Sequence, residues 1–136
     1  MNNIERTKII DVPVDIVSLN QATELIGQII SDKKKLHVIT VNAEMVMLTK
    51  EDQEFFSILK NAGLIIPDGS GIVWALRRDG IKIKKLPGIE LAQNCISHLT
   101  AKIFLIGGKE EIISQAYQNL NKSSNKSILL GYRNGY

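Results

Sequence analysis

The sequence is poor in cysteine, in histidine and in long apolar runs, and each shortage excludes a class of structure. A single Cys95 cannot form a disulfide within the chain and is typical of a protein from a reducing cytoplasm. His37 and His98 stand far apart, so no spacing typical of a metal site is present. No apolar run reaches the roughly 20 residues that a membrane-spanning helix needs, and the N-terminus is not a secretory signal. We therefore expect a cytoplasmic chain without a protein-bound metal or cofactor.

The remaining composition is that of an ordinary globular protein: of 136 residues, 44% are hydrophobic and 23% are charged. This length favours one domain that spans residues 1–136. The net charge of +3 is too small to indicate a nucleic-acid partner. Five of the nine residues 77–85 are nevertheless basic. This segment is either a contact for phosphates or anionic lipid head groups, or a solvated linker.

Apolar segments with strand-like and helix-like spacing alternate along the chain. We expect strands at 37–41, 64–66, 103–106 and 128–130, preceded by one extended segment over 8–17. We expect helices around residues 20–30, over 43–62 with a break near Lys50, over 70–78, after Gly88 and around 112–120. The strands are continuously apolar rather than alternating, which indicates that helices cover both faces of a parallel sheet. The fold class is therefore α/β.

Local signals predict where two of these helices begin. Ser18 or Asn20 is suited to cap the first helix, because either side chain can accept a backbone N–H. Thr49 followed by Asp52 resembles a capping box, which would restart the helical region after its break.

The end of the chain predicts a longer protein. Tyr136 follows closely on the strand at 128–130, and no helix is left to cover that strand. We therefore expect these residues to be the N-terminal portion of a larger domain.

Polar side chains follow two of the expected strands at the point where each strand ends. Thr40 and Asn42 end the strand at 37–41, and Asp68 follows the strand at 64–66. Ligands of parallel sheets bind outside the carboxyl ends of the strands, so we expect these side chains to face one cleft. Pro67 and Gly69 place the Asp68 carboxylate in a sharp turn, where it would serve as a general base. Its alternative role as N-cap of the following helix is equally favoured.

Further candidates are weaker on pattern alone. The hydroxyl of Thr40 and the amide of Asn42 can bind a sugar or a phosphate, or they are simply a strand residue and a helix cap. Gly107 and Gly108 form a turn in which a diphosphate can approach backbone N–H groups, although such turns often need glycine anyway. Trp74 occupies the third glycine position of a dinucleotide fingerprint, which argues against a nicotinamide enzyme.

Five segments together resemble one family of enzymes. They are TVNAEMVML (40–48), PDGSGIVWALRRDG (67–80), LPGIEL (86–91), IFLIGGKEE (103–111) and GYRNGY (131–136). In this order they resemble the WecG/TagA/CpsF glycosyltransferases, and most closely the TagA branch. The resemblance implies a Rossmann-like fold and inverting, metal-free transfer of N-acetylmannosamine from UDP-ManNAc to undecaprenyl-diphosphate-linked GlcNAc in wall teichoic acid synthesis. It also implies a peripheral position at the inner membrane face, through a C-terminal segment beyond these residues.

The resemblance also assigns roles to residues. It makes Asp68 the catalytic base, with Thr40 beside it. Substrate binding falls to Asn42, Lys85, Gly107, Gly108, Tyr132 and Tyr136. Where relatives often carry arginine, this chain has Lys85, which neutralises a diphosphate without the bidentate fork of arginine.

Other readings stay open at this point. One is a non-catalytic module that binds a nucleotide or a lipid diphosphate, another is a family member that uses a different UDP-sugar, and a third is an interaction domain. The oligomeric state is also left open.

Overall fold

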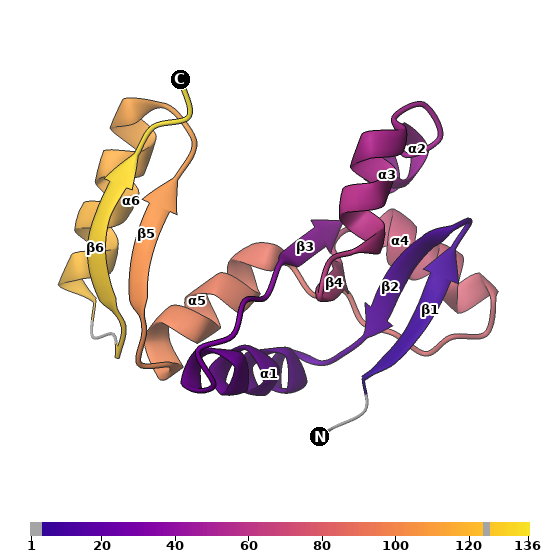
Figure 1. Ribbon diagram of the computed structural model, residues 1–136, viewed down its shortest axis with the longest axis horizontal. Helices are drawn as coiled ribbons and strands as arrows, with labels where there is room; N and C mark the ends of the chain where they lie inside the picture. The colour runs from indigo at the N-terminus through magenta and orange to yellow at the C-terminus, as the bar shows by residue number, and fades with distance from the viewer. Residues whose placement is uncertain (1–3, 124–125) are drawn as a thin grey trace. The chain divides into compact units, whose positions relative to one another are not determined.

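The computed structural model describes residues 4–123 and 126–136 (Figure 1). The chain forms two compact units, one from Met1 to Leu91 and one from Ala92 to Tyr136. Helices and strands alternate along most of the chain and two of the strand pairs are parallel, which confirms the predicted α/β class. Among the described residues, every helix is too short or too polar to cross a lipid bilayer.

The first unit begins with a hairpin and continues with alternating helices and strands. Its elements are β1 (Glu5–Ile9), β2 (Val12–Ile16), α1 (Leu19–Ser31), β3 (Val38–Val41), α2 (Ala43–Leu48), α3 (Gln53–Lys60), β4 (Leu64–Pro67) and α4 (Ser70–Arg78). Helix α5 (Gly88–His98) begins in this unit. The prediction of one extended segment over 8–17 is wrong, because β1 pairs antiparallel with β2. The chain reverses at Ile10, whose φ is 57°.

The predicted helix starts are confirmed in part. Ser18 caps α1 as half of a capping box with Gln21. The predicted break near Lys50 separates α2 from α3. Its cap is Asp52, whose carboxylate accepts the backbone N–H of Phe55 at 2.8 Å. The predicted capping box at Thr49 is wrong, because that hydroxyl donates back to the carbonyl of Val46 and ends α2 instead.

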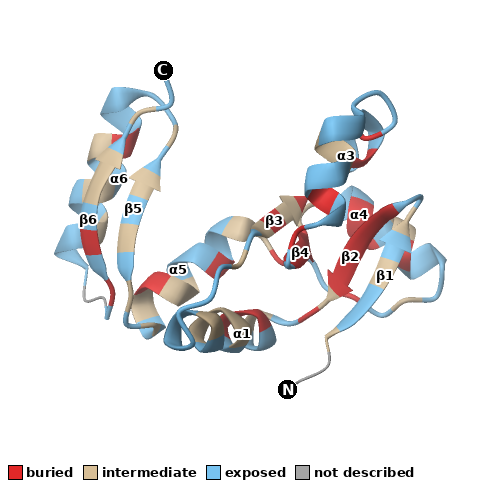
Figure 2. Ribbon diagram, viewed as in Figure 1, coloured by how far each residue is buried: buried red, intermediate tan, exposed pale blue. Residues whose placement is uncertain are grey.

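The core of the first unit lies around β2 and β4. Figure 2 shows both strands almost entirely buried, and the parallel strand β3 lies beside β4 with Thr40 opposite Ile66. Helices α3 and α4 add one apolar face each. The largest fully buried side chains here include Leu59, Leu64, Ile65, Ile66, Ile72 and Leu76. Burial of such side chains contributes about 1.5–3 kcal/mol each to folding.

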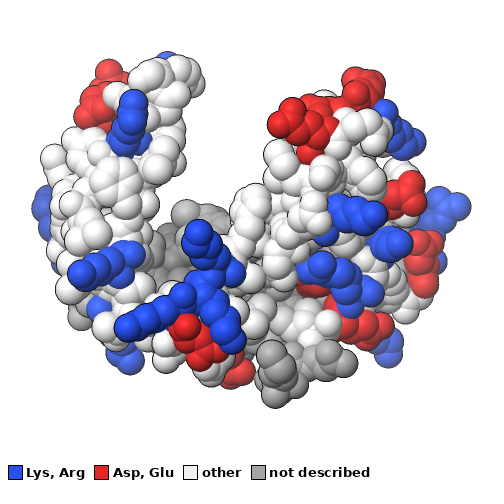
Figure 3. Space-filling model, viewed as in Figure 1, with Lys and Arg blue, Asp and Glu red and all other residues white. Residues whose placement is uncertain are grey.

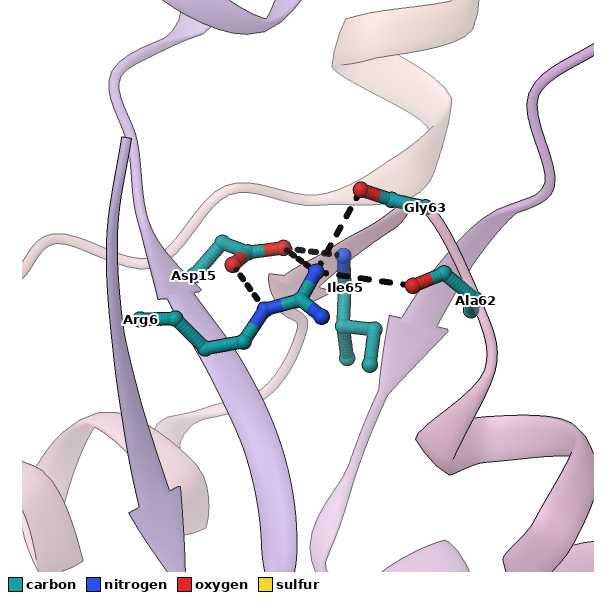
Figure 4. A network of polar contacts seen from close by, with 5 residues as sticks. All are labelled: Arg6, Asp15, Ala62, Gly63 and Ile65. Carbon is teal, nitrogen blue, oxygen red and sulfur yellow. Dashed lines mark hydrogen bonds and ion pairs between the residues drawn. The ribbon is translucent and has the colours of Figure 1, made fainter. Parts of the chain in front are cut away.

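A buried carboxylate joins the hairpin to β4 (Figure 4). Asp15, 2% exposed, accepts Nε and Nη2 of Arg6 at 2.6 and 2.9 Å and the backbone N–H of Ile65 at 2.7 Å. The same guanidinium donates to the carbonyls of Ala62 and Gly63. Hydrogen bonding to Asp15 raises the pKa of Arg6 above its ordinary value. Strands β2 and β4 are not paired with each other in a sheet. The Asp15 side chain therefore links them through its hydrogen bond to the Ile65 amide.

The second unit is a parallel strand pair with one helix. Strand β5 (Lys102–Ile106) pairs with β6 (Ile128–Arg133), and α6 (Glu110–Lys122) packs along the pair (Figure 1). Large apolar side chains of the strands are exposed; they are Phe104, Ile106, Ile128 and Leu130, at 52%, 75%, 61% and 59%. We call these four residues the open face.

Candidate active site

The carboxyl ends of β3 and β4 lie side by side. In the parallel register Val41 is opposite Pro67, and the backbone N–H of Asp68 donates to the carbonyl of Val41 at 2.9 Å. A Cβ placed on Gly69 would lie 3.8 Å from the Cβ of Asn42. The two polar clusters that follow these strands therefore meet at one edge.

Asp68 is held by a backbone amide rather than acting as a helix cap. Its Oδ2 accepts the N–H of Gly88 at 3.2 Å. Helix α4 has Gly69 as its N-cap, with a φ of 109° and no side-chain hydrogen bond. The N-cap alternative for Asp68 is therefore wrong. Asp68 is half-buried, so it is partly accessible to a ligand.

The segment that ends in Gly88 is bound to the end of β4. The N–H of Leu86 donates to the carbonyl of Pro67 at 2.9 Å, two residues before Gly88 reaches the carboxylate. A Cβ on Gly88 would lie 2.5 Å from Cγ2 of Thr40, a separation that real Cβ atoms essentially never show. Gly88 was not among the residues predicted from the sequence. One signal in the sequence could have indicated Gly88: it directly follows Pro87 in the LPGIEL segment (86–91), which carries part of the family resemblance.

Thr40 lies in β3, and Asn42 directly follows that strand. Thr40 is half-buried against Gly88. Asn42 is exposed, and its Oδ1 accepts the N–H of Met45 at 2.9 Å, so it is the N-cap of α2. The cap alternative for Asn42 is therefore confirmed. The side-chain amide nitrogen of Asn42 can still donate a hydrogen bond to a ligand. That role stays a prediction.

Lys85 lies on the basic segment that follows α4, and this segment lines two hollows of the first unit. One hollow, of about 370 Å³, includes Lys85 and Glu90 and lies against the start of α1. The other, of about 490 Å³, is lined by Arg77 and residues 80–84. Arg77 is fixed there by donating its Nε to the carbonyl of Ile83 at 3.1 Å. Part of the basic segment is therefore folded against the protein rather than a free linker.

In the second unit, the predicted glycine turn is tied to the end of the chain. Gly107 and Gly108 have φ values of 122° and 70°, a region that glycine occupies without strain. The N–H of Gly107 donates to the carbonyl of Arg133 at 3.0 Å, and that of Gly135 donates to the carbonyl of Gly108 at 2.9 Å. The turn after β5 and the GYRNGY segment therefore form one loop cluster.

Two acidic side chains and one lysine lie beside this loop cluster. Residues Lys109, Glu110, Glu111, Asn134 and Tyr136 line a hollow of about 380 Å³. In Figure 3 acidic atoms gather where α6 begins, and the first turn of that helix holds Glu110 and Glu111. Carboxylates suit hydroxyl groups of a ribose better than phosphates.

The two predicted tyrosines differ in their surroundings. Tyr132 is half-buried, with its ring 5.2 Å from that of Tyr117. Desolvation, followed by the nearby Glu110, raises the pKa of the Tyr132 phenol above its ordinary value. Tyr136 is 93% exposed, which leaves its ring open to a ligand.

The predicted residues thus fall into two groups. Thr40, Asn42 and Asp68 meet in the first unit, with Lys85 three residues before Gly88. Gly107, Gly108, Tyr132 and Tyr136 belong to the second unit. Within residues 4–123 and 126–136, no three His, Cys, Asp or Glu side chains gather into a metal-binding cluster.

Comparisons with known proteins agree on one family. Residues 7–136 match the Glycosyl transferase WecG/TagA/CpsF family. Among similar proteins are N-acetylglucosaminyldiphosphoundecaprenol N-acetyl-beta-D-mannosaminyltransferases of Staphylococcus aureus strains NCTC 8325 / PS 47, COL and MRSA252. Each is 28% identical over 141 aligned residues, which cover 99% of this chain and 55% of the relative. The chain therefore spans about half the length of these relatives.

Proposed function

Because this chain belongs to the WecG/TagA/CpsF glycosyltransferase family, we propose that it acts as an inverting hexosyltransferase. Its donor is UDP-N-acetylmannosamine and its acceptor is N-acetylglucosamine linked to undecaprenyl diphosphate. The names of the Staphylococcus aureus relatives support this choice of sugar and acceptor. The product would be the linkage disaccharide of a wall teichoic acid.

The observation that carries the proposal is the half-buried Asp68 carboxylate at the edge where β3 and β4 end. In the reaction, a hydroxyl oxygen of the acceptor attacks the anomeric carbon of the donor and forms the new C–O bond. The bond from that carbon to the UDP oxygen breaks, and its electron pair leaves with UDP. Asp68 takes the hydroxyl proton, as a general base does. One displacement of this kind inverts the anomeric carbon.

The remaining residues bind the two substrates. Lys85 supplies positive charge for the diphosphate that leaves, and Thr40 and Asn42 hydrogen-bond the sugar. The loop cluster of Gly107, Gly108, Tyr132 and Tyr136 binds the nucleoside, with Tyr136 against the base. Glu110 and Glu111 at the same hollow suit the ribose hydroxyls. No metal takes part in this scheme, because protein charge and backbone N–H groups stabilise the leaving group.

The nature of the acceptor sets where the protein works. An undecaprenyl lipid stays in the membrane, so the enzyme acts at the inner face of the plasma membrane as a peripheral protein.

Calorimetry and a transfer assay test the proposal. UDP and UDP-N-acetylmannosamine should bind, binding should survive EDTA, and UDP-N-acetylglucosamine should bind more weakly. Label from the N-acetylmannosamine donor should then appear on a soluble short-chain polyprenyl-diphosphate-N-acetylglucosamine acceptor. Absence of UDP binding, or a strict need for Mg²⁺ or Mn²⁺, would contradict the scheme.

The second candidate function is binding without transfer. It needs only the diphosphate and nucleotide contacts around Lys85, Gly107 and Gly108, and it does not need Asp68 as a base. In that case UDP or the lipid diphosphate binds, but no label reaches the acceptor.

A further inference from the structure

We propose that Gly88 is the positioning residue for the Asp68 carboxylate. This inference rests on the proposed function for its catalytic meaning, but its structural part can be tested without turnover. The amide of Gly88 binds Oδ2 of Asp68, so that Oδ1 is the oxygen that receives the acceptor's proton. The missing side chain of Gly88 is what allows the amide to reach the carboxylate past Thr40.

The hydrogen-bond pattern fixes the carboxylate from both ends. The backbone N–H of Asp68 is held by the carbonyl of Val41, and the side chain is held by Gly88. Among the described residues, the amide of Gly88 is the hydrogen-bond donor to this carboxylate. A carboxylate bound through one oxygen cannot rotate freely, so its other oxygen keeps a constant direction. That direction is what a general base needs.

The segment before Gly88 is itself anchored. Leu86 donates its N–H to the carbonyl of Pro67, the residue directly before Asp68. Two hydrogen bonds two residues apart therefore join the 86–88 turn to the end of β4. Movement of the whole turn away from the end of β4 would break both.

Steric contact with Thr40 explains why a glycine is needed. A Cβ on residue 88 would lie 2.5 Å from Cγ2 of Thr40, 3.4 Å from its Cβ and 3.7 Å from its Oγ1. Only the Cγ2 methyl contact is prohibitive, because the other two distances are ordinary van der Waals contact. An alanine at 88 would push the turn away from β3, and the amide of residue 88 away from Asp68.

The geometry therefore links three residues in one unit: Thr40 sets how near residue 88 can come, and residue 88 sets where Asp68 points. When Oδ1 takes the proton, Oδ2 is the carbonyl oxygen of the resulting acid and still accepts the Gly88 amide. Gly88 thus acts through Asp68 and does not touch the substrate.

A double-mutant cycle tests this arrangement. Gly88→Ala should lower kcat by about 10²-fold, as small displacements of a catalytic group do, and leave UDP affinity unchanged. Thr40→Ser removes the Cγ2 methyl and keeps the hydroxyl. In the Thr40→Ser background, Gly88→Ala should cost about tenfold less than in the wild-type background, because contacting residues couple. Gln93→Ala, an exposed position of α5, is the matched control and should change neither constant.

Amide hydrogen exchange at residue 88 tests the hydrogen bond independently of catalysis. The amide should lose protection in Asp68→Ala and keep it in Asp68→Asn, which retains an acceptor oxygen. Equal protection in both variants would overturn the proposal, even if transfer is observed. An equal loss of kcat from Gly88→Ala in both Thr40 backgrounds would overturn the steric part. If the exchange result holds but the wild-type chain neither binds UDP nor transfers sugar, the positioning stands and the proposed function fails.

Discussion

Arg6 and Asp15 form a bidentate ion pair across the β1–β2 hairpin, with the two guanidinium nitrogens 2.6 and 2.9 Å from the two carboxylate oxygens (Figure 4). The pair also reaches β4, because Asp15 accepts the N–H of Ile65. Three residues beyond Ile65 the same strand leads into Asp68. The hairpin therefore helps to fix the strand that carries the candidate base.

Asp15→Ala should lower the free energy of unfolding by about 2–4 kcal/mol, because it leaves a charged guanidinium and a buried amide without their partner. Chemical denaturation followed by circular dichroism measures this. Asp32→Ala is the matched control, since Asp32 pairs with Lys34 at the surface, and it should barely change stability. An equally small effect at both positions would show that the contacts of Asp15 with Arg6 and Ile65 do not stabilise the fold.

Asp68→Asn should reduce turnover by about 10²–10⁴-fold, the usual contribution of a general base. Folding and UDP affinity should stay near wild type, because an asparagine oxygen can still accept the Gly88 amide. The measurement is steady-state transfer at saturating acceptor. Near-normal turnover would limit Asp68 to a structural role at the end of β4.

Asn42 offers a test that separates capping from substrate binding. Asn42→Ala should lower the free energy of unfolding by about 1 kcal/mol, because α2 loses its N-cap. Asn42→Asp keeps an acceptor for Met45 and should keep stability, but it loses the amide donor. If the amide binds the sugar, the KM for the donor should rise in Asn42→Asp. An unchanged KM in that variant would leave Asn42 as a cap alone.

The raised pKa of Tyr132 predicts that the stability of the fold depends on pH in the alkaline range. Its pKa is raised in the folded protein, so the folded state favours the neutral phenol relative to the unfolded chain. This stabilisation is complete below the ordinary tyrosine pKa of about 10 and is lost as pH rises through the folded pKa. Tyr132→Phe should remove that part of the alkaline loss of stability. Thermal melts of both proteins across this range provide the comparison, and parallel curves would contradict the prediction.

Sequence patterns predicted the elements whose signals are local. Helix α4 spans the residues expected, because the 67–71 turn and the charged residues 77–79 mark both of its ends. The hairpin was missed because its reversal at Ile10 uses a β-branched residue with positive φ, which no turn signal announces. The second helical region broke where expected, but through Asp52 rather than Thr49.

The positions of the candidate residues were predictable where topology alone brings them together. Thr40, Asn42 and Asp68 meet because parallel strands end at one edge. Gly88 was missed, because its role depends on a turn 20 residues away folding back onto Asp68 and its place after Pro87 does not show that contact. Its contact with Thr40 is equally non-local. Such contacts produce no residue spacing that can be recognised in a sequence.

The open face of the β5–β6 pair gives the chain an unusual response to temperature. Its four side chains, among them Ile106 at 75% exposure, present apolar area to water. The attraction between such areas weakens on cooling and strengthens on warming. Concentrated solutions should therefore stay clear in the cold and scatter light on mild heating, well before the core of the first unit melts. The double variant Phe104→Ser, Ile106→Thr should abolish this light scattering. Scattering that begins only when the protein unfolds would show that the denatured chain, and not the open face, causes the association.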